Sequence, residues 1–190
     1  MKSILNNKNT LIIKNSKFIC LTYQIHKTDE INRILNEVKE KYPNATHYCY
    51  AYIIDGISKE SDDGDPSGTA GMPILQVLNK NNLDHVLCIV VRYFGKIKLG
   101  ANGLIRAYSH SVKECIAEHI VELEKGFIIN ISFPYSLLKK IDHLLPETCL
   151  IKKEFNEIVF YQTIVNQNLL NELKILNVKI DIIDETFIAC

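Results

Sequence analysis

Residues 126–190 alternate between strand-like and helix-like patterns in an order that few folds can accommodate. Apolar residues occupy every second position in the strand-like stretches and recur every three to four positions in the helix-like ones. The pair Asn156-Glu157 should join two strands as a tight hairpin, and Asn166 can cap a helix. The elements we expect are strands over Phe127–Phe133, Thr148–Phe155, Ile158–Val165 and Val178–Phe187, with helices over Tyr135–Leu145 and Asn166–Leu176. Their order, β-α-β-β-α-β, predicts a ferredoxin-like domain.

Residues 1–125 predict a second α/β unit, organised around one buried strand. The run VLCIVV within Asp84–Tyr93 is apolar at each position, as is typical of a strand covered on both faces. The other elements we expect are a hairpin of strands Leu11–Ile13 and Phe18–Tyr23, a helix capped by Thr28 and ending near Lys41, a strand over His47–Ile54, a polar loop over 55–68, a short helix from Thr69 to Leu78, and a long helix from about Asn102 to Ile120. The sequence therefore predicts an α/β (α+β) protein with two domains, 1–125 and 126–190.

The charge balance limits what such a protein could bind. Lys and Arg total 22, and Asp and Glu also total 22, so the formal net charge is zero. A dedicated duplex-DNA binder usually carries a basic excess, so we expect no duplex-DNA specificity and only a local patch for any nucleic acid. The apolar runs are too short for a membrane helix or a signal peptide. We therefore expect a cytoplasmic protein that does not associate with membranes.

The six cysteines predict neither a zinc site nor a disulfide framework. None stands in a CxxC pair, and most lie within apolar runs. We expect them to be buried, reduced thiols, as is usual in the cytoplasm.

The strongest functional signal lies between the buried strand and the long helix. From Val86 to Lys113 there are five basic residues and no acidic one. A glycine-rich turn that leads into a helix presents free backbone N–H groups and the positive end of the helix dipole. We expect an anion site suited to a phosphodiester backbone; the alternative is a tight turn with merely solvated cations. The candidate anion- or RNA-binding residues are Arg92, Lys96, Lys98, Asn102 and Arg106.

The acidic stretch Ser61–Thr69 (SDDGDPSGT) is the second candidate site. Clustered carboxylates could hold Mg²⁺ or Ca²⁺, but the spacing is not that of an EF-hand. Asp-Gly and Asp-Pro-Ser-Gly are also turn sequences, whose side chains accept bonds from nearby backbone N–H groups. We favour structured turns, which could pair with Arg92 or Arg106, and predict no metal and no cofactor. The candidates for lining a cleft here are His47, Asp63, Ser67 and Thr69.

A hydrolase or metal-dependent enzyme using the acidic loop is the alternative function. Ser67 or Ser109 could serve as a nucleophile. His47 or His110 could serve as its base, oriented by an Asp of the loop. The sequence has no Gly-x-Ser-x-Gly nucleophile elbow, and a histidine that opens an aromatic strand is more commonly structural. We therefore favour a binding protein over an enzyme.

Three tyrosines, Tyr48, Tyr50 and Tyr52, alternate and should share one face of their strand. These tyrosines, together with Tyr93 and Phe94, could stack on single-stranded bases. Packing against the long helix explains such a face as well, and half-buried sheet faces are often aromatic. We favour a core role for this face.

Three stretches of the first unit resemble the YigZ/IMPACT family. They are HYCYAY (His47–Tyr52), SDDGDPSGTAG (Ser61–Gly71), and RYFG (Arg92–Gly95) followed by RAYS (Arg106–Ser109). The resemblance covers roughly residues 10–120, and the carboxy-terminal half resembles the second domain of the two-domain bacterial members. Tyr48 stands where the family often has a second histidine, and Lys96 and Asn102 replace common glycines. These departures weaken any two-histidine site.

The resemblance implies both a fold and a role in translation. The family's first domain is similar to the second domain of ribosomal protein S5 and to a domain of translocation elongation factors. Eukaryotic relatives regulate translation with an extra domain that we expect this chain to lack. What carries over is the expectation of a translation-linked binding protein that contacts RNA or a ribosome-associated partner. A purely protein-binding adaptor is a third hypothesis.

Overall fold

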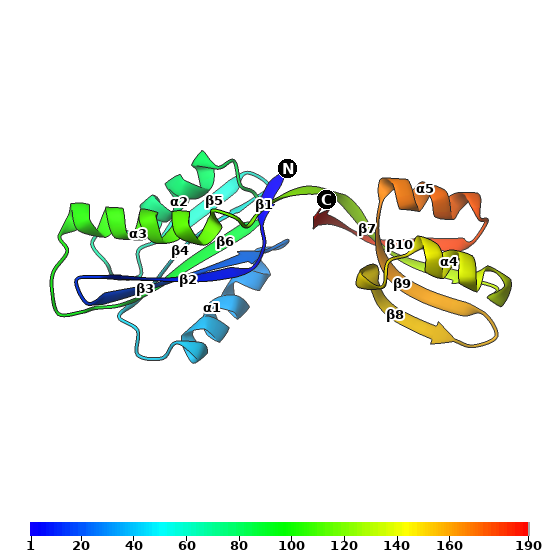
Figure 1. Ribbon diagram of the computed structural model, residues 1–190, viewed down its shortest axis with the longest axis horizontal. Helices are drawn as coiled ribbons and strands as arrows, with labels where there is room; N and C mark the ends of the chain where they lie inside the picture. The colour runs from blue at the N-terminus through cyan, green and yellow to red at the C-terminus, as the bar shows by residue number, and fades with distance from the viewer. Residues whose placement is uncertain (190) are drawn as a thin grey trace. The chain divides into compact units, whose positions relative to one another are not determined.

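A computed structural model describes residues 1–189, which divide into one compact unit over Met1–Glu122 and another that begins at Leu123 (Figure 1). In the first unit the elements are β1 (Lys2–Ile4), β2 (Asn7–Ile13), β3 (Ser16–Gln24), α1 (Asp29–Lys41), β4 (His47–Ile54), β5 (Ile57–Ser61), α2 (Gly71–Lys80), β6 (Val86–Tyr93) and α3 (Ala101–Ile116). The second contains β7 (Ile120–Phe133), α4 (Leu138–Leu144), β8 (Leu150–Phe155), β9 (Val159–Asn166), α5 (Gln167–Ile175) and β10 (Lys179–Ala189), with short 3₁₀ turns at Tyr135–Leu137 and Glu147–Cys149. No helix in the described chain is long and apolar enough to cross a membrane.

The sheet of the first unit has the order β2-β3-β6-β4-β5, and each neighbouring pair is antiparallel. The central strand β6 is buried from Val86 to Arg92. Val86, Cys88 and Val90 face the core beneath α2 and α3. Leu87, Ile89 and Val91 face the core beneath α1. Helices thus cover both faces of the sheet (Figure 1). This explains the continuous apolar run of β6 and confirms the prediction that the strand is buried on both faces.

The polar stretch 55–68, predicted to be a loop, contains the edge strand β5. A two-residue turn reverses the chain between β4 and β5, because Ile54 pairs with Ile57. Asp55 and Gly56 both have positive φ, at 51° and 74°, which is the backbone of a type I′ hairpin turn. Asp-Gly is a strong hairpin signal, but five acidic residues close by make the stretch resemble a loop.

The tyrosine face of β4 packs against α1 and not against the long helix α3. Tyr48, Tyr50 and Tyr52 are half-buried beside the cluster that α1 covers. The Tyr48 hydroxyl donates to the carbonyl of Tyr42 at 2.6 Å. The core role is therefore right, but the covering helix was wrongly assigned, because strand periodicity says which residues share a face and not what lies over it.

Neither predicted threonine cap is formed in the first unit. Thr28 makes no side-chain bond at the start of α1. Glu30, in the first turn of that helix, accepts instead from the N–H groups of His26 and Lys27, at 2.7 and 2.9 Å. Thr69 precedes α2, but its hydroxyl donates to the carbonyl of Pro66 at 2.6 Å. Four described cysteines, Cys20, Cys49, Cys88 and Cys115, are buried as expected and Cys149 is half-buried, whereas Cys190 lies outside the described residues.

The second unit has the predicted β-α-β-β-α-β order, and its strands pair in the sequence β10-β7-β9-β8, all antiparallel. Alternate residues of β7 from Phe127 to Phe133 meet Ile141 of α4 and Leu170 of α5 in one core, so both helices cover the same face. The Asn166 side chain accepts from Leu169 N–H at 2.9 Å, which confirms the predicted cap. The fold is ferredoxin-like. One predicted strand begins late, because Glu147–Cys149 form a 3₁₀ turn.

The strand β7 runs through the predicted boundary at residue 125. Its residues Ile120–Glu122 pair with β1, and the rest pair with β9 and β10. The long helix α3 accordingly ends at Ile116, four residues before the predicted end.

Candidate anion-binding site

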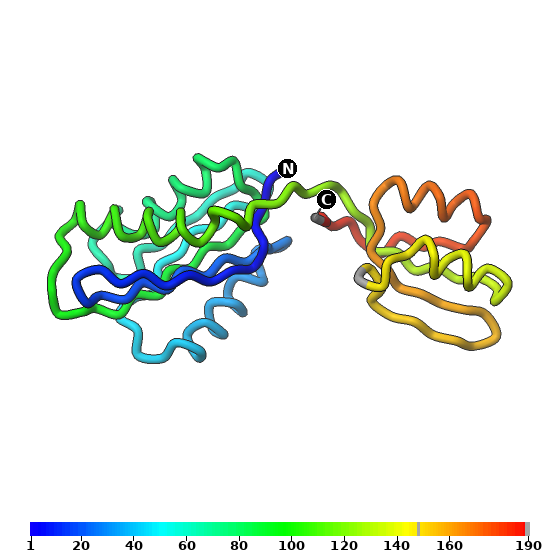
Figure 2. Tube along the Cα trace, viewed as in Figure 1, coloured from blue at the N-terminus to red at the C-terminus, as the bar shows by residue number. Residues whose placement is uncertain are grey.

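One pocket of the first unit, of about 370 Å³, brings together the two stretches that the sequence singles out. Its lining comes from the acidic loop at Asp65, the end of β6 at Arg92, and the turn and first residues of α3 from Lys98 to Ala101. The hairpin turn between β2 and β3 lies at the same end of the unit as the loop from β6 to α3 (Figure 2). The acidic loop and the basic turn are thus complementary parts of one site.

Asp65 is the buried centre of this pocket. Its carboxylate accepts from Nη1 of Arg92 on one oxygen and from the hydroxyl of Tyr108 on the other. Asp65 and Arg92 are only 7% and 5% exposed, so each charge depends on the other for compensation. Burial, together with the nearby Cys49, raises the pKa of Tyr108 well above its ordinary range, so its hydroxyl keeps the proton that it donates. The predicted pairing of the acidic loop with an arginine involves Arg92, not Arg106.

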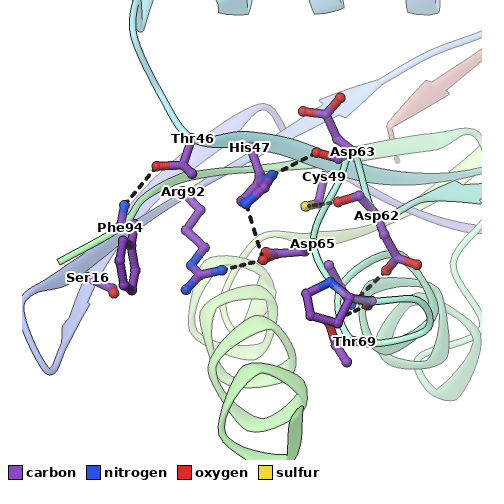
Figure 3. Close-up of polar contacts among 12 residues, drawn as sticks. Ser16, Thr46, His47, Cys49, Asp62, Asp63, Asp65, Thr69, Arg92 and Phe94 are labelled. Carbon is purple, nitrogen blue, oxygen red and sulfur yellow. Dashed lines mark hydrogen bonds and ion pairs between the residues drawn. The ribbon is translucent and has the colours of Figure 1, made fainter. Parts of the chain in front are cut away.

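His47 links the acidic loop to the same centre (Figure 3). Its Nδ1 lies 2.8 Å from the carbonyl oxygen of Asp63, and its Nε2 lies 3.3 Å from Oδ1 of Asp65. Both ring nitrogens therefore lie near oxygen atoms of the acidic loop. In the described part of the chain, the polar partners of His47 are Asp63 and Asp65, and that of His110 is Glu114. Within residues 1–189, neither histidine is hydrogen-bonded to Ser67 or Ser109.

The remaining carboxylates of the acidic loop bind backbone N–H groups. Asp62 caps α2, because its Oδ1 accepts from Ala70 and Gly71 at 2.9 and 2.8 Å. Its Oδ2 accepts from Gly68 at 2.7 Å. Asp63 accepts from Tyr48 N–H at 2.6 Å. These bonds are the structured turns that the sequence favoured, and in residues 1–189 no cluster of three or more His, Cys, Asp or Glu side chains is placed to hold a metal ion.

Asp62 therefore ties the stability of the loop to pH. Partial burial raises the pKa of Asp62, but the N–H donors of Gly68, Gly71 and Ala70 outweigh burial, and the net pKa is lowered. A lowered pKa in the folded state means that the carboxylate stabilises the fold above the unfolded pKa of about 3.9 and loses this effect as pH falls through the folded value.

We predict that Asp62→Asn lowers the free energy of unfolding by about 1 kcal/mol near neutral pH, the usual cost of a weakened helix cap. The difference from the wild type should shrink as the pH falls from about 4 downward, because both proteins then carry a neutral side chain. Urea unfolding at neutral and acidic pH measures both quantities. An equal difference at both pH values would show that the charge of Asp62 is not what stabilises the loop.

The start of α3 opens into the pocket without a side-chain cap. Gly100 is the N-cap, with φ 72°, and the first turn contains no acidic residue. The first N–H groups of a helix have no partner inside it, so those of Ala101, Asn102 and Gly103 remain available. Together with the positive end of the helix dipole they make a site suited to an anion.

The structure separates the predicted basic residues into different settings. Lys98 is exposed and lines the pocket, whereas Arg92 lies buried in its wall. Arg106 lines a second hollow of about 300 Å³ with Lys14 and His110. Leu99 contributes to both hollows, so they adjoin. Lys96 and Asn102 are exposed, and neither lines the first pocket; of the cleft candidates only His47 does.

Two contributors to the site escape sequence reasoning, Thr46 and Lys14, whereas Phe94 was among the aromatics considered for base stacking. Thr46 accepts from Phe94 N–H at 3.0 Å, and Ser16 accepts from Gly95 N–H at 3.1 Å, so the start of the turn is fixed at two points. The guanidinium carbon of Arg92 lies 5.7 Å from the centre of the Phe94 ring (Figure 3). The sequence feature that could have indicated the contact between the two turns was Gly95, which lies in close contact with the hairpin turn that carries Lys14.

Comparisons with known proteins all point to the same family. The family model of the Impact N-terminal domain matches residues 14–116, which include the whole lining of the pocket. The IMPACT family member YvyE of Bacillus subtilis is 41% identical over 167 residues, covering 84% of this chain and 76% of the relative. The IMPACT family member YigZ of Escherichia coli is 32% identical over 111 residues, covering 56% of this chain and 54% of the relative.

A solved structure shares the fold over nearly the full length. It is the crystal structure of a hypothetical protein, with a TM-score of 0.62 and 23% identity, and the match covers 96% of this chain and 97% of the other. At this identity the likeness concerns the fold alone.

Proposed function

The chain belongs to the IMPACT family, and from this premise we propose that it is a regulatory binding protein linked to translation, which contacts RNA or a ribosome-associated partner. The contact would be made through the basic glycine-rich turn and the pocket beside it. The observation that carries this proposal is the uncapped start of α3, which opens beside Lys98 into a pocket. Among the lining residues that the structure describes, the one carboxylate is that of Asp65, which Arg92 already compensates.

Phosphate is the ligand chemistry that this arrangement favours. Free N–H groups, the helix dipole and an exposed lysine each attract an anion. The adjoining hollow adds Lys14 and Arg106, so the positive surface continues beyond the first pocket. Phe94 is 42% exposed at the pocket and offers a ring on which a base could stack. These features favour RNA over a protein as the contacted surface.

The link to translation rests on a different argument. It comes from the family and from the likeness of the first domain to the second domain of ribosomal protein S5, which is an argument from fold. Co-sedimentation with ribosomes at low and high salt tests it directly. Recovery of one protein partner without RNA or ribosomes would favour the adaptor hypothesis.

We predict that Lys98→Ala reduces the salt dependence of single-stranded RNA binding. Each phosphate contact releases condensed counterions, so the slope of log affinity against log salt should fall by about 0.7. The melting temperature should stay nearly unchanged, because Lys98 is exposed and such substitutions usually cost less than about 0.5 kcal/mol. Fluorescence anisotropy with a labelled oligoribonucleotide over a salt series measures the slope.

Lys113→Ala is the matched control, since Lys113 is an exposed lysine in the last turn of the same helix. It should leave the slope as in the wild type. If the wild-type protein binds neither RNA nor ribosomal particles at low salt, or if Lys98→Ala behaves like the control, the proposed contact is wrong.

A further inference from the structure

We propose that the pocket at the start of α3 binds a terminal nucleotide, with its phosphate monoester at the helix N-terminus and its base against Phe94. The inference rests on the proposed function and specifies its ligand. A nucleoside monophosphate and the phosphorylated end of an RNA share this chemistry, and both are tested below.

The size of the pocket suits one nucleotide. Its volume of about 370 Å³ lies at the lower end of the roughly 300–1,000 Å³ typical of small-molecule sites. A folded RNA element would not enter it. An internal phosphodiester runs along a surface, whereas a terminal group can reach into a recess.

An unpaired donor of Arg92 independently indicates that the pocket could take up a hydrogen-bond acceptor. Its guanidinium carbon lies 5.6 Å from the centre of the Phe18 ring and 5.7 Å from that of Phe94. Nη1 is bound to Asp65, but the buried Nε has no hydrogen-bond partner within residues 1–189. A buried donor without an acceptor is unfavourable, and Arg92 lines the pocket, which is where an acceptor could enter.

The other donors converge on the same space. The hydroxyl oxygen of Thr46 accepts from Phe94 N–H, so its proton is available to a ligand. The N–H groups at the start of α3 and the ammonium of Lys98 complete the set. A monoester carries about −1.5 to −2 charges near neutral pH and offers three acceptor oxygens, which matches several donors better than a diester does.

The apolar wall fits the other half of the ligand. Phe94 is held by its backbone bond to Thr46, and Leu99 and Leu104 also line the pocket. Every base has a π-face, so stacking on Phe94 would tolerate any base. The inference is therefore that the site requires the phosphate and accepts different bases.

The test uses the full chain and isothermal titration calorimetry with AMP, UMP, adenosine and inorganic phosphate. We expect AMP and UMP to bind with similar affinity, and adenosine and inorganic phosphate to bind at least about tenfold more weakly. Equal binding of AMP and adenosine, or no binding of AMP at millimolar concentration, would overturn the inference if the oligonucleotide arms below also show no phosphate dependence.

The second arm compares short oligoribonucleotides that carry a 5′-phosphate, a 3′-phosphate or hydroxyls at both ends. Tighter binding of one phosphorylated form, beyond that of AMP, identifies an RNA end as the source. Binding of AMP without any advantage for phosphorylated RNA identifies a free nucleotide. If RNA binds through Lys98 but neither AMP nor a phosphorylated end is preferred, the proposed function stands and this inference fails.

Phe94→Leu separates the two halves of the site while keeping an apolar side chain in place. It should weaken AMP binding about fivefold or more, because stacking is lost, and leave the binding of inorganic phosphate as in the wild type. Ile97→Ala, at an exposed position of the same turn, is the control and should change neither. An unchanged affinity of Phe94→Leu for AMP would remove the base from the proposed geometry.

Discussion

Asp65→Ala should lower the free energy of unfolding of the first unit by about 3–5 kcal/mol, the usual cost of removing one partner from a buried ion pair. The substitution would leave the guanidinium of Arg92, 5% exposed, without its counter-charge. The hydroxyl of Tyr108 would lose its acceptor at the same time. Urea unfolding followed by circular dichroism measures the change.

Two further variants decide whether the ion pair is the cause. Glu40→Ala removes a carboxylate from the exposed face of α1 and should cost less than about 0.5 kcal/mol. Adding Arg92→Leu to Asp65→Ala removes the uncompensated charge, so the double variant should be more stable than the sum of the single costs by about 0.5–3 kcal/mol. Strictly additive costs would mean that Asp65 stabilises the unit through something other than Arg92.

Gly95→Ala should cost about 1–3 kcal/mol, in the range of overpacked sites, and should also abolish binding at the pocket. A Cβ at this position would lie 2.0 Å from the carbonyl carbon of Asn15 and 2.3 Å from the nitrogen of Ser16. Both are backbone atoms, so no side-chain rotation can relieve the clash. The turn must move away from the hairpin, and Phe94 moves with it.

Unfolding experiments and RNA titration together test this prediction. Ile97→Ala, two residues further along the turn, is the control and should leave both stability and binding near wild-type values. Gly95→Ala and Lys98→Ala should therefore differ in kind: the first loses stability and binding, and the second loses only binding strength. A Gly95→Ala protein of unchanged stability would contradict the close approach of turn and hairpin.

The parts of the fold that could be predicted are those encoded by neighbouring residues. The period-two pattern of β7, the apolar run of β6 and the Asn166 cap each depend on residues within a few positions of one another. The β5 hairpin also had a local signal in Asp55-Gly56, but the acidic composition of the stretch outweighed it.

The site was predictable only in outline, because its decisive contacts join residues distant in sequence. The basic turn and the acidic loop were both identified, but Arg92 and Asp65 are 27 positions apart, and nothing local indicates that they are buried together. Arg92 was predicted to be an exposed phosphate contact because of its charge alone. Phe94 was identified as an aromatic that could stack on bases, but the bond that joins it to Thr46, 48 positions away, has no local signal.

The pairing of β1 with β7 has a consequence for how the protein is made. Lys2 pairs with Glu122, and Ile4 pairs with Ile120. At about 5–20 residues per second, a ribosome needs on the order of 6–24 s to synthesise the chain between these partners. Throughout that interval β1 lacks the strand that it pairs with in the folded sheet, and Ser3 and Ile4, both buried in the folded protein, are without the cover that β7 provides.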